Sequence, residues 1–531
     1  MDGYQKKYLP LFLGIAVALG IAVGSQLNYS SSSGLLSKNN AKKEKLNRLI
    51  DYIDYEYVDD VNTDSIVDVT VNSILENLDP HSVYIPPTDM ERMSESMKGD
   101  FVGIGVSFYP ENDTIVVINA IKGGPSDKAG ILGGDRIVSA NGKGLTGKNV
   151  TSDSLVGSLK GKINTTVDLE VKRPGKTALL KMKVTRDVVP IISIDASYML
   201  TDKLGYVKIN RFAETTPTEF KDALQQLKRD GATKIVLDLR DNPGGYISAA
   251  EQVVDEFLKE DRLILFTKNK TGNIENSFAT DGGIFEDAEV FVLVNENSAS
   301  ASEIVAGAMQ DNDQGTIVGR RTFGKGLVQR EMALGDGSAV RLTIARYYTP
   351  TGRSIQRPYD NGNKAYYEEY LNRYQNGEMA SIDSIKVDDS LRFTTPGGKV
   401  VYGGGGIIPD VFVPKETDYE KESIDYALRS GFMSRYVFNL LERDRKYYNT
   451  LNLAKFKEEV EISDADISDF VSYAARREIK ITAKAYKEEL KRSIKAVMAQ
   501  QLFGTTLYEQ MINNDDAMVK KVISLSNSKK T

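Results

Sequence analysis

From Ile194 onward the chain alternates short apolar runs with stretches of helical pattern. Residues 205–209, 234–239, 290–294 and 339–348 have the composition of strands, and a helical stretch from 216 to 231 separates the first two. Such alternation is typical of folds in which helices pack on a sheet. It constrains the chain more than any other feature, because it predicts an α/β core over the middle of the sequence.

The turn after the strand at 234–239 reads DNPGG, from Asp241 to Gly245, and leads into another helix. A glycine pair at a strand-to-helix turn exposes backbone amides, which could hold an oxyanion. An ordinary tight turn accounts for the same residues equally well. The residues alone leave both interpretations open.

The segment after the strand at 290–294 carries the residues with the most chemistry. It places Ser298, Ser300 and Ser302 at the start of a predicted helix, and then a glycine-flanked lysine, Lys325. A serine hydroxyl is a weak nucleophile until a base takes its proton, and an amine serves as that base if burial holds it neutral. Spacing does not choose among the three serines. Gln329 follows the lysine by four positions, which puts both on one face of a helix or of a strand.

Two simpler interpretations compete here. Ser300 and Glu303 fit a capping box, in which a serine and a glutamate satisfy free amides at a helix start. Residues 319–325, GRRTFGK, fit most of the P-loop pattern of nucleotide-binding proteins. That pattern requires Ser or Thr after the lysine to bind magnesium, and Gly326 stands there, so we do not expect a nucleotide site.

The rest of the composition limits the alternatives. The chain has no cysteine and a single histidine, His81. A cysteine nucleophile is therefore excluded, and a Ser-His-Asp triad could use only that histidine. We expect His81, which follows Asp79 and Pro80 at the end of a helical stretch, to form structural hydrogen bonds. A protein zinc site of the usual type is implausible with these residues, and we expect neither metal nor cofactor.

The amino end has the pattern of a membrane-targeting element. Leu9 to Val23 is nearly all apolar, and Lys6 and Lys7 precede it. The residues after Val23 match a signal-peptide cleavage site weakly, so we favour an uncleaved anchor over 1–27. The lysines should stay in the cytoplasm, which places the remaining domains across the membrane. The formal net charge of −6 is small for 531 residues, and nothing in it indicates a nucleic-acid partner.

Residues 101–188 alternate apolar strands with glycine turns. The pieces FVGIGV at 101–106 and GPSDKAGI at 124–131 stand out, and GDRI and NG follow them. Glycines at 103 and 105 let backbone amides converge on a peptide's terminal carboxylate, while a strand edge pairs with the peptide. Alone, these glycines fit strand-end bulges equally well. Together the pieces resemble a PDZ domain, in which the substrate-binding loop comprises Gly103, Ile104, Gly105 and Val106.

The stretch NENSASASEIVAGAMQD, followed by GRRTFGKGLVQ, closely resembles the catalytic region of the carboxyl-terminal processing proteases, also called tail-specific proteases. The segments at 78–81, 347–356 and 402–410 resemble the same family. These proteases are serine endopeptidases with a Ser/Lys dyad. The resemblance implies that Ser300 is the nucleophile, that Lys325 is the base and that Gln329 assists it. It also implies an oxyanion hole formed by the amides of Gly244, Gly245 and Ala301.

We therefore predict a multidomain α/β and β protein that binds exposed carboxyl tails of extracytoplasmic proteins through its PDZ domain and cuts them. It would be a single-pass protein of the inner membrane with a periplasmic or equivalent catalytic domain. A PDZ scaffold that presents peptides without cutting them is the alternative, and the sequence leaves a homo-oligomer open. The predicted parts are an anchor (1–27), a linker (28–43), a helical segment (44–96), a PDZ domain (97–188), a peptidase core (189–416) with an insertion (360–397), and a helical carboxyl-terminal domain (417–531).

The carboxyl-terminal part shows no motif of this family. Tyr486, Leu490, Ile494, Val497 and Met498 form one apolar stripe of a helix, beside a basic surface. A solvated helix face explains those basic residues better than a membrane or partner contact.

Overall fold

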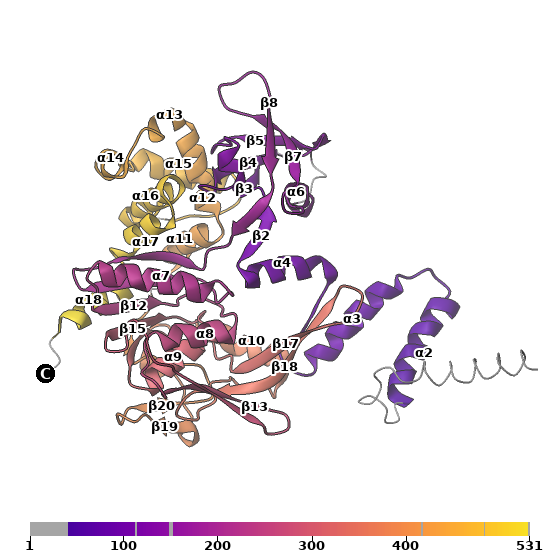
Figure 1. The fold of residues 1–531 in the computed structure, drawn as a ribbon, viewed down its shortest axis with the longest axis vertical. Helices are drawn as coiled ribbons and strands as arrows, with labels where there is room; N and C mark the ends of the chain where they lie inside the picture. Colours follow the sequence, from indigo (N-terminus) through magenta and orange to yellow (C-terminus); the bar gives the residue numbers. More distant parts are fainter. Residues whose placement is uncertain (1–40, 112–113, 148–151, 416–417, 483, 529–531) are drawn as a thin grey trace, which may run out of the picture. The chain divides into compact units, whose positions relative to one another are not determined.

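The computed structural model describes residues 41–111, 114–147, 152–415, 418–482 and 484–528 (Figure 1). It divides into two compact units, with the boundary between Ile74 and Leu75. The first unit carries α2 (Ala41–Glu56) and most of α3 (Thr63–Glu76). The predicted membrane anchor at 1–27 lies outside the described residues. Within the residues that are described, no helix is long and apolar enough to cross a bilayer.

The predicted α/β core is present in the second unit. Its sheet has six strands, and all of them are parallel except the antiparallel edge strand β10. The expected strands at 205–209, 234–239 and 290–294 are confirmed as β11, β12 and β15. In spatial order the strands are β10 (Ile194–Met199), β11 (Leu204–Ile209), β12 (Lys234–Asp238), β15 (Glu289–Val294), β16 (Gly315–Gly319) and β21 (Val411–Phe412).

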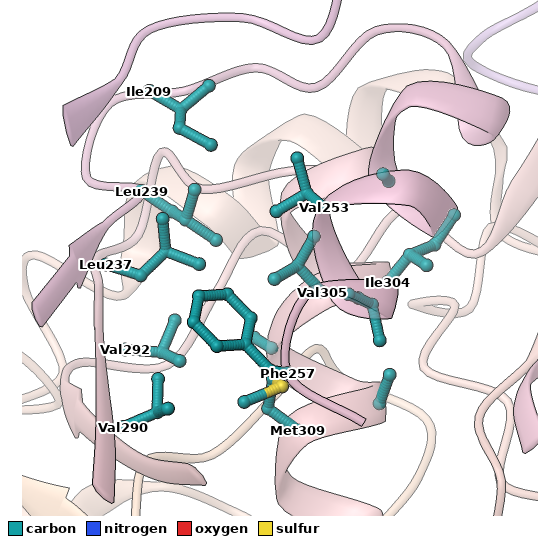
Figure 2. Close-up of a cluster of buried hydrophobic side chains, with 14 of the residues drawn as sticks. Ile209, Leu237, Leu239, Val253, Phe257, Val290, Val292, Ile304, Val305 and Met309 are labelled. Carbon is teal, nitrogen blue, oxygen red and sulfur yellow. The ribbon is translucent and has the colours of Figure 1, made fainter. Parts of the chain in front are cut away.

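Side chains of this sheet alternate between two apolar cores, as the period of a strand requires. On one face Leu237 and Val292 pack against Phe257 and against Val305 of α9 (Ala301–Asp311), as Figure 2 shows. The helices α7 (Thr216–Arg229) and α8 (Ile247–Asp255) contribute to the same core. On the other face Val236 and Phe291 meet α18 (Ala517–Asn527). Helices thus cover both faces, which is the usual state of a parallel sheet.

The second unit also contains a separate sheet, which is antiparallel. It consists of β1 (Val83–Ile85), β13 (Leu263–Asn269), β14 (Ile274–Phe278), β17 (Leu327–Ala333) and β18 (Ala339–Tyr348). β1 falls within residues 44–96, which we expected to be helical, so that expectation was incomplete. The strand pairs with β18, more than 250 positions away, and no local pattern in three residues could show this pairing. Between β1 and the PDZ domain the chain forms α4 (Pro87–Lys98).

The PDZ domain has its own sheet around a separate core of buried apolar residues. The sheet runs β3 (Val106–Glu111), β4 (Thr114–Ala120), β5 (Arg136–Ala140), β7 (Thr166–Lys172) and β8 (Leu180–Thr185), and β6 (Lys143–Gly144) pairs with β5. The helices α5 (Pro125–Lys128) and α6 (Ser152–Leu159) complete the domain, and β2 (Asp100–Gly103) pairs with β9 (Asp187–Pro190) at its base. β3 is the last strand of its sheet in the described part of the chain, so one of its edges is available to an added strand.

The predicted insertion is not a simple loop. It contains α10 (Gly362–Asn372), short 3-10 turns at 382–384 and 389–391, and β19 (Arg392–Thr394), which pairs with β20 (Val400–Tyr402).

The carboxyl-terminal region is helical, as the pattern predicted. Its first seven helices are α11 (Tyr419–Arg429), α12 (Phe432–Glu442), α13 (Arg445–Tyr448), α14 (Leu453–Glu459), α15 (Asp464–Ala475), α16 (Lys487–Phe503) and α17 (Thr505–Asn513). Leu490, Ile494 and Met498 are fully buried in α16, which confirms the apolar stripe. From α12, Phe438 reaches the PDZ domain and packs edge-on against Tyr109 of β3, with ring centroids 5.3 Å apart.

Candidate active site

The neighbouring parallel strands β12 and β15 bring two of the predicted segments together. Since both strands end at the same edge of the sheet, the DNPGG turn lies against the serine segment, and the Ala299 amide donates to the Asn242 carbonyl at 3.1 Å. Gly244 has a φ of 103°, and a Cβ at this position would lie 2.8 Å from the Cβ of Ser300. No larger residue could occupy this position without displacing the serine.

The structure distinguishes the three serines by the bonds that their hydroxyls make. Ser298 is fully buried, and its hydroxyl donates to the carbonyl of Leu239 at 2.8 Å. Ser302 is also fully buried, and its hydroxyl donates to the carbonyl of Asn242 at 3.0 Å. Ser300 is only half-buried, and among the described residues its hydroxyl donates to none. Of the three hydroxyls, only that of Ser300 therefore keeps its proton available to a ligand or a base.

Ser300 has an uncommon backbone conformation. Its φ of 56° and ψ of −113° lie outside the regions that residues with a side chain favour. Such a conformation costs about 1–3 kcal/mol and persists only where the surroundings enforce it. Here the enforcing contact is a hydrogen bond from the Ser300 amide to the carboxylate of Glu303, at 2.9 Å. The capping box expected between these two residues is thus present, and its bond from the Ser300 amide to Glu303 holds the strained conformation.

The same carboxylate holds the segment that carries the lysine. Glu303 is fully buried, and it accepts hydrogen bonds from the amides of Gly324 at 2.7 Å and Lys325 at 2.8 Å and from the hydroxyl of Thr322 at 2.5 Å. One of its oxygens, Oε2, takes the amides of both Ser300 and Lys325. A single buried group therefore fixes the backbone of the serine relative to that of the lysine.

A second buried group, the hydroxyl of Tyr347, contacts the backbone carbonyls of both Ser300 and Lys325. The hydroxyl of Tyr347 on β18 donates to the Lys325 carbonyl at 2.9 Å and lies 3.2 Å from the Ser300 carbonyl. Burial, and next the charge of Glu303, raises the pKa of this hydroxyl well above its usual value, so it is protonated and remains a donor at neutral pH. The sequence had indicated Glu303 only as the cap partner of Ser300, and it had indicated no role for Tyr347 at this site.

Lys325 has the environment that a general base needs. Burial, and next the charge of Arg341, lower the pKa of its amine to about 8, while Glu303 and Asp79 act in the opposite direction. The amine donates to Oε1 of Gln329 at 2.8 Å. Within the described residues it makes no hydrogen bond to Ser300. Catalytic hydrogen bonds are often long before substrate binds and shorten in the complex.

Gln329 lies on β17, which begins two residues after Lys325, so the two side chains meet across the start of a strand and not along one face of a helix or strand. Its amide nitrogen donates to the backbone carbonyl of His81. The imidazole of His81 is hydrogen-bonded to the Tyr366 hydroxyl at 2.9 Å, and burial, then the Lys325 charge, lowers its pKa to about 3. The neutral ring has the structural role that we expected. The contact of its carbonyl with Gln329 was not expected, because it joins residues 248 positions apart.

The backbone amides of the three residues predicted to form the oxyanion hole differ in whether they already donate a hydrogen bond. The amide of Gly244 donates to the side chain of Asn242 at 2.8 Å, so it is already occupied. The amides of Gly245 and Ala301 donate to no described residue. Gly245 and Ala301 therefore remain the available donors, and Gly244 provides the close approach of the turn to Ser300.

After Lys325 the chain enters the strand β17 and not a helix. A P-loop needs a helix at this point, because the helix's first amides bind the phosphates. The structure thus agrees with the expectation that residues 319–325 form no nucleotide site.

The predicted tail-binding loop connects β2 to β3 in the PDZ domain. Gly105 has a φ of 68°, and Ile104 anchors the loop in the core with 2% of its surface exposed. The amides of Ile104 and Gly105 donate to no group in the described parts of the chain. Free amides at the start of an edge strand are the arrangement that binds a terminal carboxylate in β-augmentation.

Comparisons with known proteins match three parts of the chain to family models. Residues 203–360 match the model of peptidase family S41, residues 102–184 match that of the PDZ domain, and residues 424–504 match a family of unknown function. The chain is 36% identical over 305 residues to a carboxy-terminal-processing protease of Bartonella bacilliformis, which covers 57% of this chain and 69% of the relative.

A second relative is the carboxy-terminal processing protease CtpA of Bacillus subtilis, with 32% identity over 359 residues, 66% of this chain and 76% of the relative. Among solved structures, the photosystem II D1 C-terminal processing protease is 25% identical, covers 70% of this chain and 87% of its own, and superposes with a TM-score of 0.36.

The charge of Arg341 gives a test of the lysine's environment. Trace acetylation of Lys325, followed by mass spectrometry across a pH series, should show its amine titrating near pH 8. Replacement of Arg341 by Gln removes the cation that lowers this pKa, so the titration should move to higher pH. Arg330→Gln, an exposed arginine on β17, is the control and should leave the midpoint unchanged. A wild-type midpoint at the usual lysine value, about 10.4, would contradict this account of the site.

Proposed function

Because the chain belongs to peptidase family S41 and carries a PDZ domain, we propose that it is a serine endopeptidase that cuts the exposed carboxyl tails of other proteins with Ser300 and Lys325. One observation carries the proposal. The only one of the three serines with a free hydroxyl shares the carboxylate of Glu303 with a lysine whose pKa is lowered to about 8. A peptide-binding scaffold would need neither the strained serine nor the buried amine.

In the proposed reaction the Ser300 oxygen attacks the scissile carbonyl while the neutral amine of Lys325 takes the hydroxyl proton. The resulting ammonium then gives this proton to the leaving amine, and water repeats the sequence to release the acyl group. Gln329, tethered to the carbonyl of His81, keeps the amine from turning away. The amides of Gly245 and Ala301 would stabilise the oxyanion of the tetrahedral intermediate.

The PDZ domain would supply the substrate. A tail added to the free edge of β3 would place its terminal carboxylate against the amides of Ile104 and Gly105, with Gly103 and Val106 flanking them. The proposed substrates are therefore proteins and peptides with accessible carboxyl ends.

The first test replaces each serine in turn. Ser300→Ala should abolish cleavage of a tailed protein substrate by removing the nucleophile. Ser302→Ala removes only a hydroxyl that holds the Asn242 carbonyl, so this variant should retain activity wherever it is folded, as circular dichroism would verify. Tail binding by the PDZ domain should survive in both variants. Cleavage by the Ser300→Ala protein at the wild-type rate would refute the proposal, and tail binding with no cleavage by the wild type would support the scaffold.

The second test concerns recognition of the carboxylate. A charge-assisted hydrogen bond contributes about 1.5–3 kcal/mol, and about 1.4 kcal/mol corresponds to a tenfold change in affinity. Amidation of the substrate's tail should therefore raise KM by roughly tenfold or more and leave kcat unchanged. The control is the same peptide with a free carboxyl end. Equal KM values for the two peptides would show that the loop at 103–106 does not bind the carboxyl terminus.

We also propose that residues 1–27 anchor the protein in the cytoplasmic membrane, with the peptidase on the far side. The support is the apolar run after Lys6 and Lys7. In intact cells the folded domains should be protected from added protease, and they should be digested once the outer barrier is opened. A cytoplasmic location of the peptidase, seen as protection that persists until the inner membrane is lysed, would contradict this topology.

A further inference from the structure

The inserted helix α10 and the residues that follow it contact the lysine loop, the serine segment and the residues that hold Gln329. These residues, 362–378, lie outside the stretch that matches the peptidase family, which ends at residue 360. We call them the α10 segment. Nothing in the sequence pattern indicated a role for them.

Arg373, at the end of α10, holds the loop that carries the lysine. Its side chain is fully buried, and Nη1 donates to the carbonyl of Thr322 at 2.8 Å. Nη2 lies 3.4 Å from the carbonyl of Phe323. Thr322 and Phe323 directly precede Gly324 and Lys325. The carbonyls of this loop are thus fixed by Arg373, while Glu303 fixes its amides on the other side.

Tyr370, one helical turn earlier, reaches the serine segment. Its hydroxyl donates to the side-chain oxygen of Asn297, three residues before Ser300. Its ring also packs on Phe323, with centroids 5.2 Å apart. A single side chain thereby contacts the loop of the nucleophile and the loop of the base.

The start of α10 reaches the third component, the residues that hold Gln329. The hydroxyl of Tyr366 is hydrogen-bonded to the imidazole of His81, and that of Tyr367 donates to the carbonyl of Pro80 at 3.0 Å. The carbonyl of His81 in turn accepts from Gln329. The α10 segment therefore contacts the serine segment and the lysine loop directly, and it reaches Gln329 through Pro80 and His81.

Several of these contacts are buried ion pairs, and burying charged groups costs free energy of desolvation. Three arginines, Arg321, Arg357 and Arg373, surround Glu369 and Glu378, and all three are buried. Burial, and next the charge of Arg321, lowers the pKa of Arg373 to about 10. Apolar side chains of similar volume attach an element at least as firmly as buried charges do. What the guanidinium adds is direction, because its fixed N–H bonds hold chosen carbonyls in place.

From these contacts we infer that Arg373 and Tyr370 are positioning residues, which hold the lysine loop and the serine segment at their working separation. The inference rests on the proposed function. Neither residue meets the substrate's reacting atoms. Their effect should therefore appear in the rate of the chemical step and not in the binding of a peptide.

Three variants test it: Tyr370→Phe, Arg373→Met and Arg373→Lys. Tyr370→Phe keeps the ring and removes one hydrogen bond, so kcat should fall by about two- to tenfold, with KM for a short peptide unchanged. Arg373→Met should lower kcat by roughly tenfold or more, and Arg373→Lys should restore part of the loss. Assays are run at a temperature at which each variant is folded by circular dichroism. Lys364→Ala, on the exposed side of the same helix, is the control and should match the wild type.

The pH profile separates positioning from stability. Arg373 is not among the charges that act on Lys325. If it positions the loop, its loss should admit water to the amine and move the rising limb of kcat from near pH 8 to higher pH. A lowered unfolding temperature with kcat and pH midpoint unchanged in both Tyr370→Phe and Arg373→Met would overturn the inference. If Arg373→Met does not fold, Tyr370→Phe alone decides.

Failure of the proposed function gives a different result. In that case the wild type would cleave no tailed substrate at all, or Ser300→Ala would cleave it as fast as the wild type. Wild-type cleavage that depends on Ser300 but is indifferent to Tyr370 and Arg373 would leave the peptidase proposal standing and reject only the positioning role.

Discussion

The carboxylate of Glu303 accepts four hydrogen bonds without any exposure to solvent, and the candidate site depends on it. Two of the donors are the amides of Ser300 and Lys325. The first residue begins a helix of the parallel sheet's layer, and the second precedes a strand of the antiparallel sheet. A change in the position of either sheet would break bonds to a buried carboxylate, which costs more than the loss of exposed bonds. The geometry of the two residues is therefore tied to the packing of the two sheets.

The sheets also explain why the other components lie where they do. Parallel pairing of β12 with β15 brings the DNPGG turn to the serine, since both strands end at one edge. Antiparallel pairing of β17 with β18 places Gln329 opposite Thr343, and β1 pairs further along the same strand. The residues just before β1 include His81, whose carbonyl holds Gln329. The amino-terminal part of the second unit is thus needed to complete the surroundings of the lysine.

The elements whose residues are close together in the sequence could be predicted from it. The strands of the core, the serine segment and the lysine loop each have a local pattern, and the apolar stripe of α16 is periodic. Glu303 was visible only as a cap partner of Ser300, since its bonds to Gly324 and Lys325 require the fold. The pairing of β1 with β18, the contact of His81 with Gln329 and the contact of Arg373 with Thr322 each join residues that are far apart in the sequence. Contacts of this kind leave no periodic pattern of apolar residues in the sequence.

Glu303 lies close to Lys325, and its negative charge acts on the pKa of the Lys325 amine. A carboxylate beside an amine favours the ammonium form, whereas a general base must be neutral. Here the oxygens of Glu303 are occupied by backbone amides and by the Thr322 hydroxyl, so its charge is directed at the backbone and not at the amine. The amine donates to the neutral Gln329 instead, and burial together with Arg341 outweighs the attraction of Glu303. A neutral partner for the amine and amide partners for the carboxylate allow one buried acid to lie beside Lys325 while the pKa of the amine stays near 8, below its usual value.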